Sequence, residues 1–149
     1  MDKKFMQRAI ELAKIAEENG DVPIGAVVVK NGEIVGEGYN RREIDNNPTA
    51  HAEIEAITEA GKRLGTWHLD DCDLYVTLEP CPMCAGAIIN SRIKTLIFGA
   101  YDSKAGSASS DSVINLFDLP YNHKPEIYGG ICENETSKLL KDFFQAKRK

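Results

Sequence analysis

Two short segments of the sequence carry residue types that bind metals and move protons. His51 and Glu53 are separated by one residue, and Cys81 and Cys84 follow Pro80 in a Cys-x-x-Cys motif. In a protein that carries no secretion signal, such a motif is either a redox pair or a pair of metal-binding thiolates. The two cysteines by themselves do not decide between these alternatives.

The choice depends on a third ligand. A structural zinc site is closed by four protein ligands, whereas a catalytic site takes three and leaves the fourth position for water. The sequence has no second Cys-x-x-Cys motif and no His-x-x-x-His pair, and Cys72 and Cys132 stand alone. We therefore favour a catalytic zinc site made by His51, Cys81 and Cys84, and we interpret Cys72 and Cys132 as structural thiols.

The Cys-x-x-Cys motif is expected at the beginning of a helix. Pro82 suits the first helical position, which makes Cys81 the expected N-cap and places Cys84 in the first turn. The positive end of the helix dipole favours anions there, so we expect the pKa values of both thiols to fall. A metal site and a redox site would both benefit from this placement.

A second helix N-terminus is expected to bring His51 and Glu53 to the same place. Residues two apart point about 200° apart in a helix interior, given ~3.6 residues per turn, but in the first turn they can converge on a site at the helix end. We therefore expect segments 50–53 and 81–84 to meet at the metal, where free N–H groups would stabilise an oxyanion or hydroxide. The alternative for Glu53 is an ordinary first-turn acid that interacts with the helix dipole.

Hydrophobic periodicity and boundary signals predict the elements that must position these segments. Helices are expected over residues 2–19, 48–64, 82–91 and 133–149, with a short helix near 113–117. Strands are expected over residues 24–30, 33–39, 74–78, 95–99 and 126–128, and Asn31-Gly32 predicts a hairpin turn between the first two. Strands that alternate with helices imply an α/β fold whose sheet contains parallel pairs and is covered on both faces.

Length and composition restrict the class of protein. The chain has 149 residues, 42% hydrophobic and 28% charged, so we expect one globular domain over residues 1–149. The longest apolar stretch, 24–29, is far shorter than the ~20 residues of a membrane span. The first residues are charged and form no signal-peptide core, which predicts a cytoplasmic protein without a membrane partner. A net charge of −5 excludes a uniformly basic surface for nucleic acid but not a local basic rim.

His-x-Glu followed by Pro-Cys-x-x-Cys resembles the signature of the zinc-dependent nucleoside and nucleobase deaminases. The wider sequence resembles the bacterial tRNA adenosine deaminase family of the cytidine/deoxycytidylate deaminase superfamily. The matching segments run through most of the chain, and they are VPIGA (22–26), GEGYN (36–40), TAHAEI (49–54), LYVTLEPC (74–81), MCAGAI (83–88), SRI (91–93), FGA (98–100) and NH (122–123). One departure is Tyr101, because a basic residue is often found before Asp102.

This resemblance implies a three-layer α/β/α fold with a mixed central sheet of about five strands, like that of cytidine deaminase. It also implies a homodimer with one Zn²⁺ per subunit, held by His51, Cys81 and Cys84. The implied reaction is the hydrolytic deamination of adenosine to inosine at the wobble position of a tRNA anticodon, an RNA-editing step. Glu53 would be the catalytic residue, carrying protons from the zinc-activated water to N1 of adenine and to the departing ammonia.

Further residues are candidates for substrate binding. An amide both donates and accepts hydrogen bonds, and the resemblance places Asn40 against a purine edge or ribose. Asp102 and Lys104 would face the nucleotides beside the target, while Arg41 with Arg42, and His123 with Lys124, would contact phosphates. Alternatively, Asn40 could simply end a strand and Asp102 could be a turn residue. The full set of candidates is Asn40, Ala52, Asp102, Lys104, Arg41 and His123.

Two other functions remain open. A deaminase of a free base, guanine or cytosine, would share the zinc motif but not the extended match, especially at SRI (91–93) and at FGA (98–100) with Asp102. A non-catalytic, zinc-stabilised RNA-binding subunit would have no need for a proton shuttle such as Glu53. Deamination assays that compare an anticodon stem-loop with free bases and nucleosides discriminate among these functions.

Overall fold

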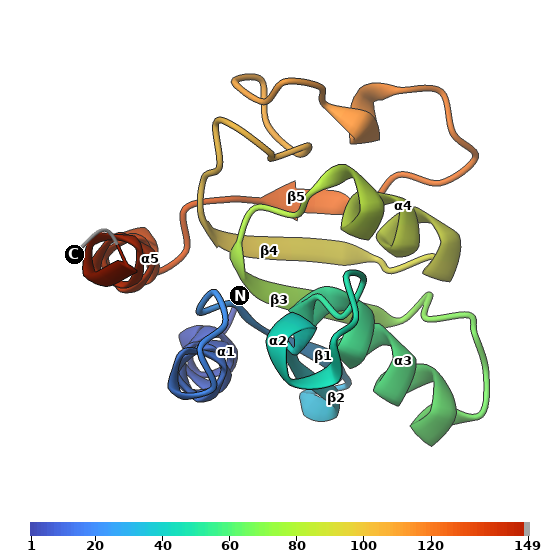
Figure 1. The fold of residues 1–149 in the computed structure, drawn as a ribbon. Helices are drawn as coiled ribbons and strands as arrows, with labels where there is room; N and C mark the ends of the chain where they lie inside the picture. Colours follow the sequence, from blue (N-terminus) through green and yellow to red (C-terminus); the bar gives the residue numbers. More distant parts are fainter. Residues whose placement is uncertain (148–149) are drawn as a thin grey trace.

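Five strands form one mixed sheet, and helices cover both of its faces (Figure 1). The structure, a computed structural model, describes residues 1–147. The strands are β1 (Gly25–Lys30), β2 (Glu33–Tyr39), β3 (Cys72–Leu78), β4 (Thr95–Ala100) and β5 (Glu126–Tyr128). Their order is β2-β1-β3-β4-β5, with β1 antiparallel to β2 and β3, and with β3–β4 and β4–β5 parallel. The predicted α/β/α fold with a mixed sheet of about five strands is confirmed.

The helices separate into two layers. They are α1 (Lys3–Glu18), α2 (Arg42–Asp45), α3 (Ala52–Leu64), α4 (Pro82–Ser91) and α5 (Glu133–Lys147), with a 3-10 turn η1 (Leu116–Asp118). Buried residues of α3 and α4 pack with one face of the sheet, whereas α1 packs on the other face, where α5 also lies (Figure 1). Residues 148 and 149, which end the predicted C-terminal helix, lie outside the described residues. Within residues 1–147 no helix is long and apolar enough to cross a membrane.

The structure differs from the predicted helices in three places. The helix expected from residue 48 begins only at Ala52, because the Asn47 side chain accepts hydrogen bonds from the backbone N–H and the hydroxyl of Thr49 in a turn. The short helix expected near 113–117 is instead the 3-10 turn η1. The four-residue helix α2 lies in a segment for which no helix was predicted.

α3 lies against β2 at a distance that only small residues allow. A Cβ added to Gly36 would lie 2.2 Å from the carbonyl oxygen of Ala56, and one added to Gly38 would lie 2.3 Å from that of Ala52. Ala52, Ala56 and Ala60 are fully buried on the facing side of α3. This close packing determines where the N-terminus of α3 lies above the sheet.

The ends of three strands meet at one edge of the sheet. β2 and β3 are both antiparallel to β1 and therefore run in the same direction, which β4 shares because it is parallel to β3. Their last residues are Tyr39, Leu78 and Ala100, and the chain continues from two of these ends into Asn40 and Tyr101. In α/β sheets this carboxyl edge is where ligands usually bind.

Candidate metal and active site

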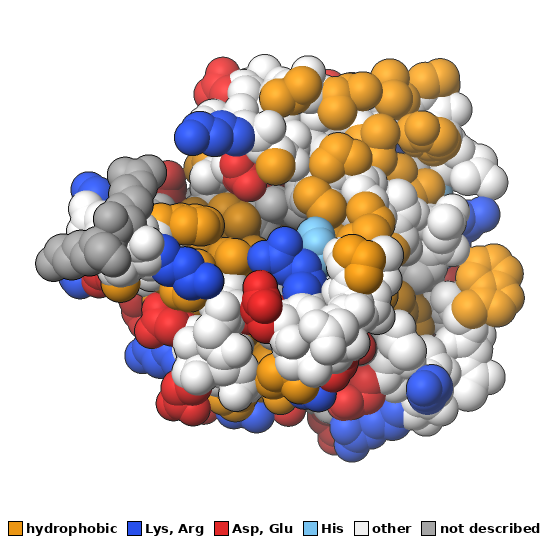
Figure 2. Space-filling view, in the orientation of Figure 1, with side chains coloured by type: hydrophobic (Ala, Val, Ile, Leu, Met, Phe, Trp, Pro, Cys, Tyr) orange, Lys and Arg blue, Asp and Glu red, His pale blue; other side chains and the backbone are white. Residues whose placement is uncertain are grey.

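A cavity of about 520 Å³ lies at the carboxyl edge of the sheet. It is lined by the segment before β1, the end of β2 and the start of α2, the beginning of α3, the turn from β3 to the N-cap of α4, the segment after β4, and α5. The lining residues are Val22, Ile24, Asn40, Arg42, His51, Glu53, Leu78, Glu79, Cys81, Tyr101, Asp102, Lys104, Ala105, Leu140 and Phe144. Figure 2 shows hydrophobic and basic side chains around the hollow on this face, where a histidine is visible. A larger hollow of about 710 Å³ lies on the outer side of α3 and α4, but none of the described residues that line it is a histidine, a cysteine or an acidic residue.

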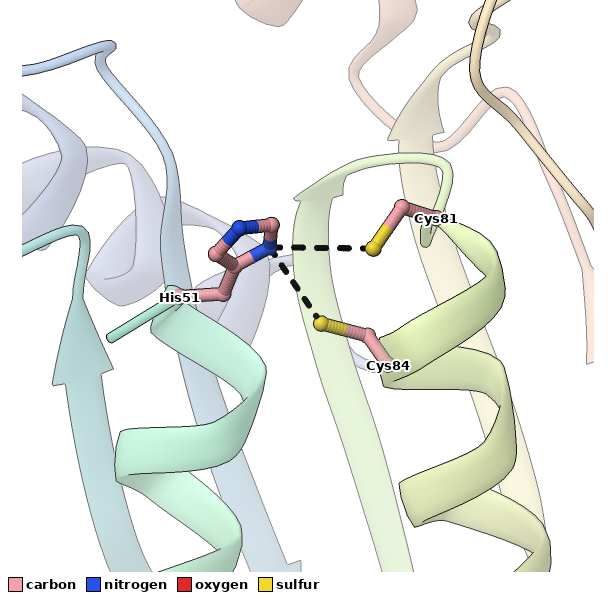
Figure 3. Close-up of side chains that lie close together, drawn as sticks. All are labelled: His51, Cys81 and Cys84. Carbon is pink, nitrogen blue, oxygen red and sulfur yellow. Dashed lines mark hydrogen bonds between the residues drawn. The ribbon is translucent and has the colours of Figure 1, made fainter. Parts of the chain in front are cut away.

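Three possible metal ligands converge at this cavity. The Nδ1 atom of His51 lies 3.7 Å from the Sγ atom of Cys81 and 3.5 Å from the Sγ atom of Cys84 (Figure 3). All three ligand atoms lie within 4.8 Å of one another, and among the described residues they form the one such group of three. The structure therefore brings together the three residues that the spacing predicted as ligands, and this group could hold a metal ion.

Two helix N-termini position these ligands. His51 is the N-cap of α3 and Cys81 is the N-cap of α4, with Pro82 in the first turn. Neither N-cap side chain makes a capping hydrogen bond to its own helix, so both side chains are free to face the site. Figure 3 shows the starts of the two helices side by side, with the three side chains between them. The predicted placement of the Cys-x-x-Cys motif at a helix start is confirmed.

In the metal-free site the pKa values of the two thiols shift in opposite directions. A hydrogen bond from the Cys84 thiol, with a further one from His51, lowers the pKa of Cys81 to about 4. The pKa of Cys84 is raised instead, because the Cys81 sulfur binds its proton and because the group is buried. The expectation that both pKa values fall is therefore wrong for Cys84. The hydrogen bond with Cys81 also raises the pKa of His51.

Glu53 lies in the first turn of α3 and lines the same cavity. Only 4% of its surface is exposed, and this burial raises the pKa of its carboxyl group to about 7. A carboxyl group in this range both accepts and releases a proton near neutral pH. Its position two residues after His51 thus places an acid–base group beside the possible metal ligands.

Asn40 connects the end of β2 with the start of α3. Its side-chain oxygen accepts a hydrogen bond of 2.9 Å from the backbone N–H of Ala52, and only 2% of Asn40 is exposed. Asn40 lines the cavity, whereas Ala52 is fully buried and is not among the lining residues. The N–H of Ala52 is therefore used to orient Asn40.

The segment after β4 forms one wall of the cavity. Tyr101, Asp102, Lys104 and Ala105 line it, so the predicted positions Asp102 and Lys104 both lie at the site. The side chain of Asp102 accepts hydrogen bonds from the backbone N–H groups of Lys104, at 3.1 Å, and Ala105, at 3.0 Å. Asp102 is thus a turn residue as well as a lining residue.

Two predicted phosphate contacts, Arg41 and His123, do not line the cavity. The Arg41 guanidinium pairs with the Asp45 carboxylate, at 2.9 Å, and does not line the cavity, whereas Arg42 does. His123 is not a lining residue either, because its Nε2 atom lies 2.7 Å from the carbonyl oxygen of Ile93. His123 therefore connects the long segment before β5 to the start of β4.

Sequence reasoning missed two parts of the site. Leu140 and Phe144 reach the cavity from α5, and the hydrophobic spacing of that helix gave no indication of which element it would face. Glu79 is buried at the cavity with 2% of its surface exposed. It lies two residues before Cys81, and a carboxylate in a strand-to-helix turn beside a metal motif could have been noticed.

Comparisons with known proteins agree with this geometry. The profile of the MafB19-like deaminases matches residues 1–148. The tRNA-specific adenosine deaminase of Bacillus subtilis is 49% identical over 149 residues, which cover 99% of this chain and 91% of that protein. A solved tRNA:A34 deaminase, from work on A-to-I editing at the wobble position, superimposes with a TM-score of 0.90 at 43% identity, covering 93% of this chain and 100% of the other.

A guanine deaminase from Bacillus subtilis is also similar. It superimposes with a TM-score of 0.65 at 38% identity, over 99% of this chain and 94% of that chain. The profile match and the relatives that are nearly half identical over almost the full length determine the family. The chain belongs to the MafB19-like deaminases, in the branch that contains the bacterial tRNA-specific adenosine deaminases.

Proposed function

We propose that this protein hydrolyses the 6-amino group of adenosine at the wobble position of a tRNA anticodon, which forms inosine and ammonia. The observation that carries this proposal is the convergence of His51, Cys81, Cys84 and buried Glu53 on one cavity. The relatives named for tRNA-specific adenosine deamination support the substrate class. A tRNA substrate also implies a cytoplasmic protein.

The donor set fits a zinc ion. One imidazole nitrogen and two cysteine sulfurs form a typical set of three protein ligands at a catalytic zinc site. Zinc bond lengths and a tetrahedral angle require about 3.6 Å between nitrogen and sulfur ligands, and the two distances here are 3.7 and 3.5 Å. A bound Zn²⁺ would supply a water molecule whose pKa is lowered to roughly 7.

Glu53 moves the protons of the reaction. Its carboxylate accepts a proton from the attacking water and delivers it to N1 of adenine, which makes C6 more electrophilic. The water oxygen forms a bond to C6. Glu53 then transfers the second proton of that water to the amino group, and the bond from C6 to nitrogen breaks as ammonia leaves. A pKa raised to about 7 by burial suits a group that must alternate between both protonation states.

The walls of the cavity bind the nucleotide. The Asn40 amide is held by its oxygen and keeps its NH₂ group for a purine edge or ribose. Asp102 and Lys104 line the same cavity, and Arg42 is the arginine that lines it with them. Because a base in an anticodon loop is already unpaired, turning it into the cavity costs less than extracting it from a duplex.

Incubation with matched substrates tests the proposed reaction. The zinc-loaded protein is incubated with an anticodon stem-loop that carries adenosine at the wobble position, and separately with adenosine, cytidine and guanine. We expect inosine in the stem-loop and no turnover of the free compounds. Deamination of a free base without inosine in the RNA would contradict the proposal. It would instead support the second candidate, a guanine deaminase, which the 38% identity to such an enzyme favours.

We also propose a homodimer formed through the outer face of α3 and α4. A hollow of about 710 Å³ lies there, and Trp67 beside it has 61% of its surface exposed. Exposed hydrophobic surface of this kind is typical of an interface. Light scattering should give the mass of a dimer for the wild type and of a monomer for Trp67→Glu; a wild-type monomer at micromolar concentration would contradict the dimer.

A further inference from the structure

Glu79 has a buried carboxylate that takes no part in the reaction proposed above. It follows β3 and lies two residues before the first cysteine of the metal motif, with 2% of its surface exposed. Burying a charge is costly unless hydrogen bonds replace the lost water. Among the described residues no salt bridge to Glu79 is formed, so its hydrogen bonds must supply this compensation.

Among the described residues, the hydrogen bonds to the Glu79 carboxylate all come from the segment that follows β4. The backbone N–H of Asp102 donates to Oε1 at 2.9 Å, and the backbone N–H of Ala108 donates to Oε2 at 2.9 Å. The hydroxyl of Ser112 also donates to Oε2. One carboxylate therefore accepts hydrogen bonds from the beginning, the middle and the end of the segment 102–112.

Close packing also places this segment directly on Glu79. A Cβ added to Gly106 would lie 2.4 Å from the carboxyl carbon of Glu79 and 2.4 Å from the carbonyl oxygen of Asp102. Next to it, the buried Ser107 donates a hydrogen bond of 2.7 Å to the carbonyl oxygen of Pro80. The segment is therefore packed directly against the Glu79 carboxylate and is hydrogen-bonded to it.

The same segment forms part of the cavity wall. Asp102, Lys104 and Ala105 line the cavity, and the N–H of Asp102 is one of the groups that Glu79 binds. We propose that Glu79 is a positioning residue that holds this wall in place for the nucleotides beside the target adenosine. This inference rests on the proposed function, and it predicts a defect in substrate binding with the metal site and the proton shuttle intact.

The variants Glu79→Ala and Glu79→Gln test the proposal in kinetic assays with the anticodon stem-loop. The alanine variant removes all three acceptor interactions, whereas the glutamine variant keeps one acceptor oxygen and turns an NH₂ group towards the remaining donors. We expect the KM of the alanine variant to rise about tenfold or more, with a kcat within about threefold of the wild type. The KM of the glutamine variant should lie between those of the wild type and the alanine variant, because its one amide oxygen still accepts part of the hydrogen bonds.

A readout that does not depend on activity accompanies the kinetics. Hydrogen–deuterium exchange of the zinc-loaded variants should become faster in segment 102–112 only, with zinc content unchanged. Ser112→Ala removes one of the three donors and should show a weaker form of the same change. Val27→Ala controls for a general loss of stability, because Val27 is a buried residue of β1 on the face of the sheet that packs with α1, away from α3 and α4.

The outcomes separate this inference from the proposed function. If the wild-type protein forms no inosine, the proposed function fails, whatever the Glu79 variants do. If the wild type is active, unchanged exchange in segment 102–112 would overturn the inference. A loss confined to kcat would also overturn it, as would an equal rise of KM in Val27→Ala.

Discussion

The side-chain oxygen of Asn40 accepts a hydrogen bond of 2.9 Å from the backbone N–H of Ala52. This bond connects the end of β2 to the first turn of α3, between the possible metal ligand His51 and the buried acid Glu53. The residue that we assign to substrate recognition therefore also holds the element that carries the chemistry. Two substitutions separate these roles.

Asn40→Asp keeps an oxygen for the Ala52 N–H but removes the NH₂ donor. We expect this variant to bind zinc with unchanged stoichiometry and to lose about tenfold or more in kcat/KM for the stem-loop, because the substrate contact is lost. Asn40→Ala also leaves the buried N–H without an acceptor, which costs about 1–3 kcal/mol of unfolding free energy. Equal activity of Asn40→Asp and the wild type would show that Asn40 only supports the helix.

Close packing of α3 on β2 gives a second prediction. Gly38→Ala would place a Cβ 2.3 Å from the carbonyl oxygen of Ala52, so α3 must move. We expect a loss of about 1–3 kcal/mol in unfolding free energy, together with weaker zinc binding. Urea unfolding and a competitive zinc titration measure these two changes.

Gly32→Ala is the matched control for this substitution. Gly32 has a φ of +76° in the hairpin turn, with no atom within 4 Å of an added Cβ, so only the backbone is strained. The control should lose about 1 kcal/mol in unfolding free energy, with no change in zinc affinity. If the two variants bind zinc equally well, the packing on β2 does not position the ligands.

The unequal thiols of the metal-free site predict a pH dependence. The pKa of Cys81 is lowered to about 4, whereas burial raises the pKa of Cys72. Since the thiolate is the reacting species, alkylation of Cys81 in the metal-free protein should already be near its maximal rate at pH 6. Cys72 should react much more slowly than Cys81, because it is buried and burial raises the pKa of its thiol.

Peptide mapping after iodoacetamide treatment measures both rates. Zinc should protect Cys81, and loading with zinc should release protons, because the thiol of Cys84 must become a thiolate to bind the metal. A Cys81 alkylation rate that keeps rising up to pH 9 would contradict the lowered pKa. Protection of Cys72 but not of Cys81 by zinc would contradict the ligand set.

Local signals were sufficient to locate the groups of the metal site. Proline after Cys81 marks a helix start, and the hairpin turn and strand pattern place Asn40 at a strand end. Each of these signals acts over a few residues, so a single sequence contains them. Topology then brings the two helix starts together, which the sequence indicated only through the need for a third ligand.

Long-range contacts explain what the sequence could not predict. The partners of Glu79 lie between 23 and 33 residues away, and no periodic pattern connects them. The sequence placed two adjacent arginines near the site but did not indicate which of them lines the cavity; in the structure Arg41 pairs with Asp45, and Arg42 is the lining residue. The contribution of α5 depends on how that helix packs on the sheet.

The central claim is that Glu53 moves the protons while other residues hold the metal. Glu53→Gln keeps the shape of the side chain but cannot accept a proton, and Glu55→Gln, in the same first turn but outside the cavity lining, is the matched control. The most direct measurement is single-turnover inosine formation in the stem-loop by both zinc-loaded variants. We predict a fall of about 10²- to 10⁴-fold for Glu53→Gln at unchanged zinc content, and a wild-type rate for the control. A folded, zinc-loaded Glu53→Gln protein that forms inosine at the wild-type rate would contradict the account.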